Sequence, residues 1–342
     1  MTTARADYPA LTGLRAIAAS VVFANHIGYL LGHTSLGRGW AAITPVSLVG
    51  VYTFFVLSGF LLAQPASLDR GPRAFWRRRA ARILPVYWLA LVGSVAMLAV
   101  TEELPGFRTI AANASLLHSW SASGQAASIN LPAWSLSVEL VFYAALPLAA
   151  PALIPWIRRQ PRASLFAIAA ACVVGSIVLQ VEAVPATFPL AYLPIFLLGV
   201  HAATVRTTVP APWLMFGAAA VTYPVLHNHA LPALAAAALI GHLASTGGPA
   251  WLRSAPALRL GAWSYGFFLL HVLVIDAGAI LLDHTIGRGA VITPVGLAVA
   301  CFAFVIAWVL SAAVYRLVEE PARRALTRRR HAVALEAAPV VR

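Results

Sequence analysis

The chain has 342 residues, of which 61% are hydrophobic and only 10% are charged, and its mean hydropathy is +0.81. This composition excludes a water-soluble globular domain and indicates a membrane protein. The formal net charge is +13 and every basic residue is an arginine. Recognition of nucleic acid requires a folded basic surface with side chains that contact the bases, and a run of arginines on a membrane loop does not provide one. We therefore expect no nucleic-acid partner.

Ten apolar stretches follow one another along the chain. A helix needs about 20 apolar residues to cross a hydrocarbon layer of roughly 30 Å, so we predict an all-α, polytopic integral membrane protein with about ten transmembrane helices. Their predicted ranges are 9–32, 41–64, 83–101, 134–157, 163–181, 187–205, 212–230, 231–247, 261–283 and 291–317. For residues 212–247 a single re-entrant element is the alternative, because Pro232 and the cluster His227-Asn228-His229 mark the joint.

The distribution of arginine predicts the orientation. With both termini in the cytoplasm, 20 of the 24 arginines lie on the inner side, three lie outside and Arg15 lies within a helix, as the positive-inside rule requires. We expect residues 1–326 to form a single transmembrane domain and residues 327–342 a disordered cytoplasmic tail. The chain is thus predicted to be a multi-pass protein of the inner or plasma membrane, surrounded by membrane lipids.

The first predicted helix carries two ionisable residues, Arg15 and His26. They are 11 residues apart, which places them within about 20° of one face and roughly 16 Å apart along the axis. Singly, Arg15 is also explained as an anchor that reaches the inner headgroups, and His26 as a buried histidine satisfied by a neighbouring helix. Together they favour a functional pair, because ionisable groups at depth cost about 2.5 kcal/mol or more unless they face a polar interior.

An arginine-rich block, DRGPRAFWRRRAARILPVYW, precedes the third predicted helix at residues 69–88. Arg79 and Arg82, with Arg78 beside them, have the spacing of a forked phosphate site, and Tyr87 and Trp88 would add a flat aromatic surface for a nucleotide-like anion. The alternative is an inner-leaflet anchor that binds anionic lipid headgroups.

In the fourth predicted helix, Glu139 lies at a depth similar to that of His26, and Ser135, Glu139 and Tyr143 form one i, i+4 stripe. A buried carboxylate beside an imidazole predicts a base and its charge-compensating partner. A structural ion pair between two helices is the other interpretation.

The ninth predicted helix adds His271 and Asp276, which lie about 140° apart around the helix, so one of them is expected to be structural. The two cysteines, Cys172 and Cys301, have no nearby cysteine or histidine at metal-ligand spacing. We therefore expect no metal site.

Taken in order, these motifs resemble the membrane acyltransferase family 3, the integral-membrane O-acyltransferases. The matching pieces are LTGLRAIAASVVFANH, GVYTFFVLSGFLLA, RRRAARILPVYW, WSLSVELVFYAALP, SYGFFLLH and YRLVEEPARR. Two positions depart from the family, which often has an acidic residue in place of Tyr52 and of Leu140.

The resemblance implies transfer of an acyl group, commonly acetyl, from cytoplasmic acyl-CoA to a hydroxyl group. The coenzyme A phosphates would bind Arg78, Arg79 and Arg82, and the pantetheine arm would pass Arg15 to reach His26. His26 would deprotonate the acceptor while Glu139 or Asp276 holds the imidazolium, or would itself carry the acyl group. Residues expected to contact substrate or to support this site are Ser58, Trp134, Ser137, His271 and Asp276.

The expected acceptor is an envelope saccharide, a glycolipid or a glycosylated metabolite, with the envelope saccharide preferred. A proton-coupled secondary transporter or flippase is the rival function, because intramembrane His, Glu, Asp and Arg are equally typical of a proton path. Against it stands the absence of a detectable repeat between the two halves of the sequence.

Overall fold

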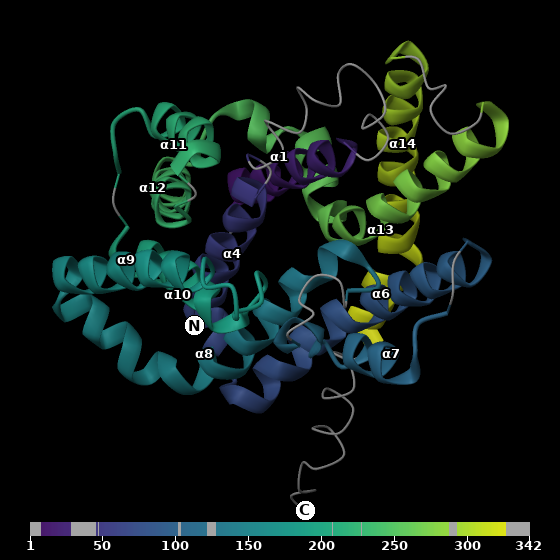
Figure 1. Ribbon diagram of the computed structural model, residues 1–342. Coiled ribbons are helices and arrows are strands. Elements are labelled where there is room, and N and C mark those ends of the chain that lie inside the picture. Colours follow the sequence, from purple (N-terminus) through teal and green to yellow (C-terminus); the bar gives the residue numbers. More distant parts are fainter. Residues whose placement is uncertain are drawn as a thin grey trace, which may run out of the picture.

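The computed structural model describes residues 8–28, 46, 48–101, 104–121, 128–206, 208–226, 228–286 and 293–325, and regular structure within these ranges is helical throughout. Figure 1 shows the helices in space. In chain order they are α1 (Pro9–His26), α4 (Leu48–Leu62), α5 (Pro65–Leu68), α6 (Gly71–Thr101), α7 (Phe107–Ala114), α8 (Trp134–Arg159), α9 (Pro161–Val178), α10 (Pro189–Val205), α11 (Pro212–Leu226), α12 (Ala230–Thr246), α13 (Ala255–Ile286) and α14 (Thr293–Val314).

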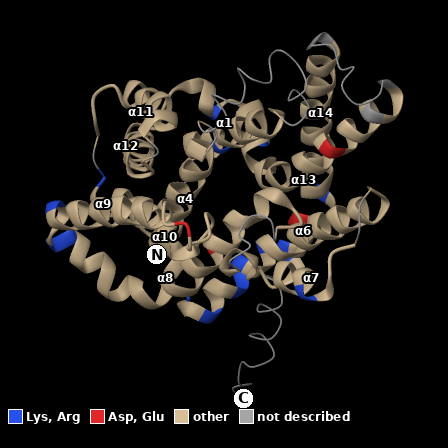
Figure 2. Cartoon of the chain, in the orientation of Figure 1, with Lys and Arg blue, Asp and Glu red and all other residues tan. Residues whose placement is uncertain are grey.

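The predicted apolar stretches each coincide with one helix, which confirms the all-α class. Within the described ranges, five helical segments are long and apolar enough to cross a membrane: Gly71–Thr101, Leu131–Arg159, Pro161–Val178, Ala255–Leu282 and Val295–Ala325. Figure 2 shows long stretches of ribbon without a charged residue. Helices α4, α10, α11 and α12 are apolar but shorter. Ten membrane crossings and the cytoplasmic placement of both termini therefore stay predictions.

Two local differences from the sequence-based prediction are informative. Helix α6 begins at Gly71, twelve residues before the predicted start at residue 83, because the arginines of the block are good helix formers and continue the apolar helix without a break. Residues 212–246 form two helices, α11 and α12, which pack against each other. Two separate crossings and one re-entrant element both stay predictions, because a packed pair of helices fits either arrangement.

The centre of the molecule is built on close helix contacts. Helix α1 packs between α13 and α4, and α4 packs against α10. A Cβ atom at Gly59 of α4 would lie 1.9 Å from the carbonyl oxygen of Phe196, and one at Gly199 of α10 would lie 2.0 Å from that of Val56. Small residues thus let two backbones touch, as is typical of helix packing in membranes.

The connection between α6 and α8 folds against the protein. Tyr87 donates a hydrogen bond to the carbonyl oxygen of Asn113 at 2.6 Å, and Ser137 donates to that of Leu116 at 2.6 Å. Leu116 is buried whereas Leu117 is half exposed. The apolar patch that these leucines form in the sequence therefore inserts one side chain into the core.

Candidate active site

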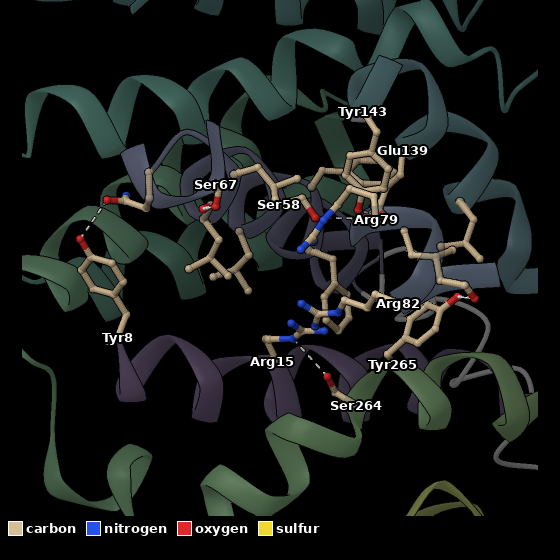
Figure 3. Close-up of a pocket in the computed structure, with 18 of the residues that line it drawn as sticks. Tyr8, Arg15, Ser58, Ser67, Arg79, Arg82, Glu139, Tyr143, Ser264 and Tyr265 are labelled. Carbon is tan, nitrogen blue, oxygen red and sulfur yellow. Dashed lines mark hydrogen bonds between the residues drawn. The ribbon is translucent and has the colours of Figure 1, made fainter. Parts of the chain in front are cut away.

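A cavity of about 540 Å³ lies between α1, α4, α6, α8 and α13 (Figure 3). Its polar lining comes from segments far apart in the sequence. The polar or charged residues that line it are Tyr8, Arg15, Ser58, Gln64, Ser67, Asp69, Arg79, Arg82, Ser135, Glu139, Tyr143, Arg206, Ser264 and Tyr265.

Three guanidinium groups converge in this cavity. Arg79 and Arg82 project from one face of α6, as their i, i+3 spacing predicts. Arg15 reaches the cavity from α1 and donates from Nε to the hydroxyl oxygen of Ser264 at 3.2 Å. Arg15 therefore faces the protein interior, which argues against the headgroup anchor considered for it.

Glu139 lies among these arginines (Figure 3). Ser58 donates to its Oε1 at 3.0 Å and Tyr143 donates to its Oε2 at 2.5 Å, which confirms that Glu139 and Tyr143 share one stripe of α8. The cavity lining holds four arginines but only two acidic residues, Glu139 and Asp69. The surplus of positive charge in a partly desolvated site suits an anionic ligand.

The predicted partnership of Glu139 with His26 is wrong in this structure. His26, at the end of α1, lies 3.0 Å through Nδ1 from Nε2 of His271, whereas the hydrogen bonds of Glu139 go to Ser58 and Tyr143. Similar depth in the sequence did not determine which way the two side chains point. The structure therefore divides the predicted catalytic set into an arginine–glutamate cavity and a histidine pair.

Hydrogen bonds assign the proton positions in the histidine pair. His271 Nδ1 lies 3.0 Å from the carbonyl oxygen of Phe267 and so carries a proton, which makes His271 Nε2 the acceptor. His26 Nδ1 lies 3.0 Å from that nitrogen and 3.1 Å from the carbonyl oxygen of Val22, so it is protonated. The lone pair of His26 is then on Nε2, as a general base requires.

One phenylalanine, Phe268, touches both the cavity and the histidine pair. Phe268 lines the cavity, and the centre of its ring is 6.2 Å from the centre of the His271 ring. Neither His26 nor His271 contributes to the lining that surrounds Arg15. Phe268 is therefore the lining residue that connects the arginine end of the cavity with the histidine pair.

The aromatic part of the predicted phosphate site is wrong. Tyr87 is fully buried and bonds to Asn113, while Trp88 donates to the carbonyl oxygen of Ala114 at 3.1 Å. Both side chains hold α7 against α6. They do not face the cavity, because residues five and six positions after Arg82 point about 120–140° away from it around the helix. Helical periodicity was the signal that would have excluded them.

Arg78 also lies outside the cavity lining, because its guanidinium donates to the carbonyl oxygen of Ser67 at 2.7 Å and holds the turn before α6. Of the predicted arginine triplet, only Arg79 and Arg82 face the cavity.

The remaining predicted residues have supporting positions. Ser58 lines the cavity and bonds to Glu139. Trp134 is buried against Phe55 and Tyr192, and Ser137 bonds to Leu116. Asp276 is half buried on α13, one and a half turns beyond His271.

Glu319 is a charged residue that sequence reasoning missed. It ends a π-helical turn, Tyr315–Glu319, that continues α14, and it is only 2% exposed. The positive charges of Arg82 and Arg15 act on its carboxyl group, and its Oε2 has no hydrogen-bond partner in the part of the chain that is described. The signal in the sequence was the adjacent acidic pair in YRLVEEPARR. The π-helical turn, a feature that occurs frequently at functional sites, became visible only in the structure.

Among the described residues, no group of three or more His, Cys, Asp and Glu side chains is arranged to hold a metal ion. The polar lining of the cavity is dominated instead by guanidinium, hydroxyl and carboxylate groups, which suit an organic anion.

Comparison with known proteins gives two matches. Residues 8–314 match a family described as Acyltransferase domain. The chain is 32% identical, over 371 aligned positions, to the protein named Acyltransferase MdmB of Streptomyces mycarofaciens, and the alignment covers 94% of this chain and 93% of that protein. No solved structure gives a significant match.

Proposed function

The chain belongs to the Acyltransferase domain family, and from this premise we propose that it is a membrane O-acyltransferase that uses acyl-CoA as its donor. The family membership confirms the resemblance to membrane acyltransferase family 3. The acyl group in the proposal is acetyl, and the acceptor is a hydroxyl of an envelope saccharide, a glycolipid or a glycosylated metabolite. The proposed location is the inner or plasma membrane.

One observation carries the proposal for the donor: Arg15, Arg79 and Arg82 converge from two helices in a single cavity (Figure 3). Guanidinium groups bind phosphate oxygens through paired, charge-assisted hydrogen bonds. Coenzyme A carries several phosphate oxygens and a long thioester arm, so the arginines supply its anchor. Glu139, fixed by hydrogen bonds from Ser58 and Tyr143, lines the same cavity and offsets part of this positive charge.

The chemistry in this proposal takes place at His26. Nε2 of His26 removes the proton of the acceptor hydroxyl while the hydroxyl oxygen attacks the thioester carbonyl carbon. The carbon–sulfur bond breaks, an oxygen ester forms, and the imidazolium returns the proton to the leaving thiolate. His271 holds the reacting tautomer through the 3.0 Å contact to Nδ1. An acyl-histidine intermediate uses the same atoms in two steps and is the second route.

Transport is the rival reading, because intramembrane arginine, glutamate and histidine also suit a proton-coupled path. The family match weighs against it, since both the family and the similar Streptomyces protein are described as acyltransferases. The two readings differ in a covalent event, the cleavage of a thioester, which can be measured directly.

The test is thiol release. Purified protein in lipid vesicles is incubated with acetyl-CoA and extracts of envelope saccharide or glycosylated metabolites, and free coenzyme A is measured with a thiol reagent. We expect acceptor-dependent thiol release by the wild-type protein and none above background by His26→Ala. Uptake of a solute without any thioester cleavage would support the transporter instead. Mass spectrometry of the acceptors identifies which compound gains the acyl group.

A further inference from the structure

The cavity has an open end that the donor-binding arginines do not occupy. Pro65, Ala66, Asp69 and Arg206 line it there and are exposed, whereas Ser264 at the opposite end is fully buried. Figure 3 shows Tyr8 at one side of the cavity, with Glu139 and Tyr143 at the other and Ser67 between them. The open end is thus formed by the start of α1, the α4–α5 connection and the end of α10.

At this open end an arginine and a tyrosine form a hydrogen bond. Arg206 donates from Nη2 to the hydroxyl oxygen of Tyr8 at 2.6 Å, and its guanidinium carbon lies 5.8 Å from the centre of the Tyr8 ring. Tyr8 in turn donates to Oε1 of Gln64 at 3.2 Å. A planar cation, an aromatic ring and an amide are thereby held together beside the cavity.

The backbone of Arg206 is unusual for an arginine. It caps α10 in the left-handed conformation, with φ 48° and ψ 79°. This position in a helix cap is most often glycine, because a residue with a Cβ atom is strained there. The helix cap does not explain why this residue is an arginine. The hydrogen bond to Tyr8 does, because it is made by the guanidinium group of Arg206.

We propose that Tyr8 and Arg206, with Gln64 positioning Tyr8, bind the nucleotide end of the acyl-CoA donor, a site that rests on the proposed acyltransferase function. A guanidinium group binds a phosphate through two parallel hydrogen bonds and also stacks on a flat base. A phenol ring offers a second stacking surface. Gln64 positions that ring, because its Oε1 accepts from Tyr8 while its Nε2 donates to the carbonyl oxygen of Phe60 at 3.1 Å. Asp69, at the same end, accepts a hydrogen bond from an exocyclic amine such as that of adenine.

The spacing along α1 agrees with an extended donor. Tyr8 precedes Arg15 by seven residues, roughly 10 Å along the helix axis, and Arg15 precedes His26 by roughly 16 Å. The order along this helix is therefore nucleotide site, arginine cluster and base. A donor that enters at Tyr8 with its thioester leading passes these groups in that order.

The experiment compares two donors in two variants. Acetyl-CoA carries the nucleotide, and acetyl-pantetheine lacks it while keeping the same thioester. Arg206→Gly removes the guanidinium and suits the left-handed cap, so the fold is kept. Arg159→Gln is the matched control, since Arg159 also ends a helix, α8, and is exposed away from the cavity.

We expect Arg206→Gly to raise the KM for acetyl-CoA by 10-fold or more, with kcat changed less than twofold and no change with acetyl-pantetheine. Arg159→Gln should match the wild type with both donors. Equal effects of Arg206→Gly on the two donors, or no effect on either, would overturn the nucleotide site while leaving the acyltransferase function intact. Failure of the wild-type protein to cleave acetyl-CoA would instead refute the proposed function, and the nucleotide site with it.

Discussion

His26 depends on a neighbouring histidine for its orientation. Its Nδ1 proton is shared between the carbonyl oxygen of Val22 and Nε2 of His271, and His271 is itself fixed by the carbonyl oxygen of Phe267. A positioning role of this kind affects the chemical step more than donor binding, because the wrong tautomer or ring orientation removes the base.

The first prediction uses two substitutions at His271. We expect His271→Phe to lower kcat about 10-fold or more with little change in the KM for acyl-CoA. His271→Gln should retain most of the activity, because its side-chain oxygen takes the place of Nε2 as acceptor. Steady-state kinetics of the two variants test this, and equal losses in both would contradict a role of His271 as hydrogen-bond acceptor.

Glu319 and Glu320 are adjacent acidic residues in different surroundings. Glu319 is buried near Arg15 and Arg82, whereas Glu320 pairs with the exposed Arg324. Removing one charge from a buried group of opposite charges leaves the others uncompensated, while an exposed pair contributes about 0–1 kcal/mol.

The second prediction follows from this contrast. Glu319→Gln should lower the free energy of unfolding by about 2 kcal/mol or more, and Glu320→Gln by less than about 1 kcal/mol. Added coenzyme A should raise the melting temperature of Glu319→Gln more than that of the wild type, because its phosphates replace the missing negative charge. Thermal unfolding with and without coenzyme A measures both effects. Unchanged melting of Glu319→Gln would mean that this carboxyl group does not compensate the arginines.

At the scale of the helices, the contact between α4 and α10 tolerates only glycine. A Cβ atom at Gly199 would lie 2.0 Å from the carbonyl oxygen of Val56 and 2.7 Å from the backbone nitrogen of Phe60, and no side-chain rotation can relieve contacts with backbone. Gly217 of α11 is a control, because nothing lies within 4 Å of a Cβ atom built there.

The third prediction is that Gly199→Ala destabilises the protein by about 3 kcal/mol or more, since the two helices must separate. Gly217→Ala should be neutral or stabilise the protein by up to about 1 kcal/mol, because alanine favours the helix. Thermal unfolding of the two variants in detergent compares them. Similar melting temperatures would show that α4 and α10 do not pack this closely.

The positions of the helices were predictable from the sequence. Which side of each helix faces the cavity was predictable only in part. Apolar length located each helix, and the i, i+3 spacing of Arg79 and Arg82 placed both on one face. The pairing of Glu139 was not predictable, because depth along one helix does not determine which neighbour the side chain meets. Glu319 was missed because its burial depends on a π-helical turn that a regular period does not describe.

At the scale of the whole molecule, packing brings together residues from opposite ends of the chain, since Arg15 and Glu319 are 304 positions apart. Arg15, Arg79 and Glu139 come from α1, α6 and α8, and Glu319 follows α14 at the other end of the chain. Folding brings these groups together in one place. A surplus of guanidinium groups at close range is unfavourable, so the site favours binding of an anion. The central claim is therefore that this cavity binds the acyl donor through its arginines.

The most direct measurement compares two pairs of arginines on the same helix. Arg79 and Arg82 line the cavity, whereas Arg73 and Arg77 precede them on α6 and are exposed. We predict that the Arg79→Ala/Arg82→Ala double variant raises the KM for acyl-CoA by about 10-fold or more, because charge-assisted contacts to phosphate are lost. The Arg73→Ala/Arg77→Ala double variant should keep the wild-type KM. Equal KM values for the two double variants would contradict the claim that the cavity binds the donor.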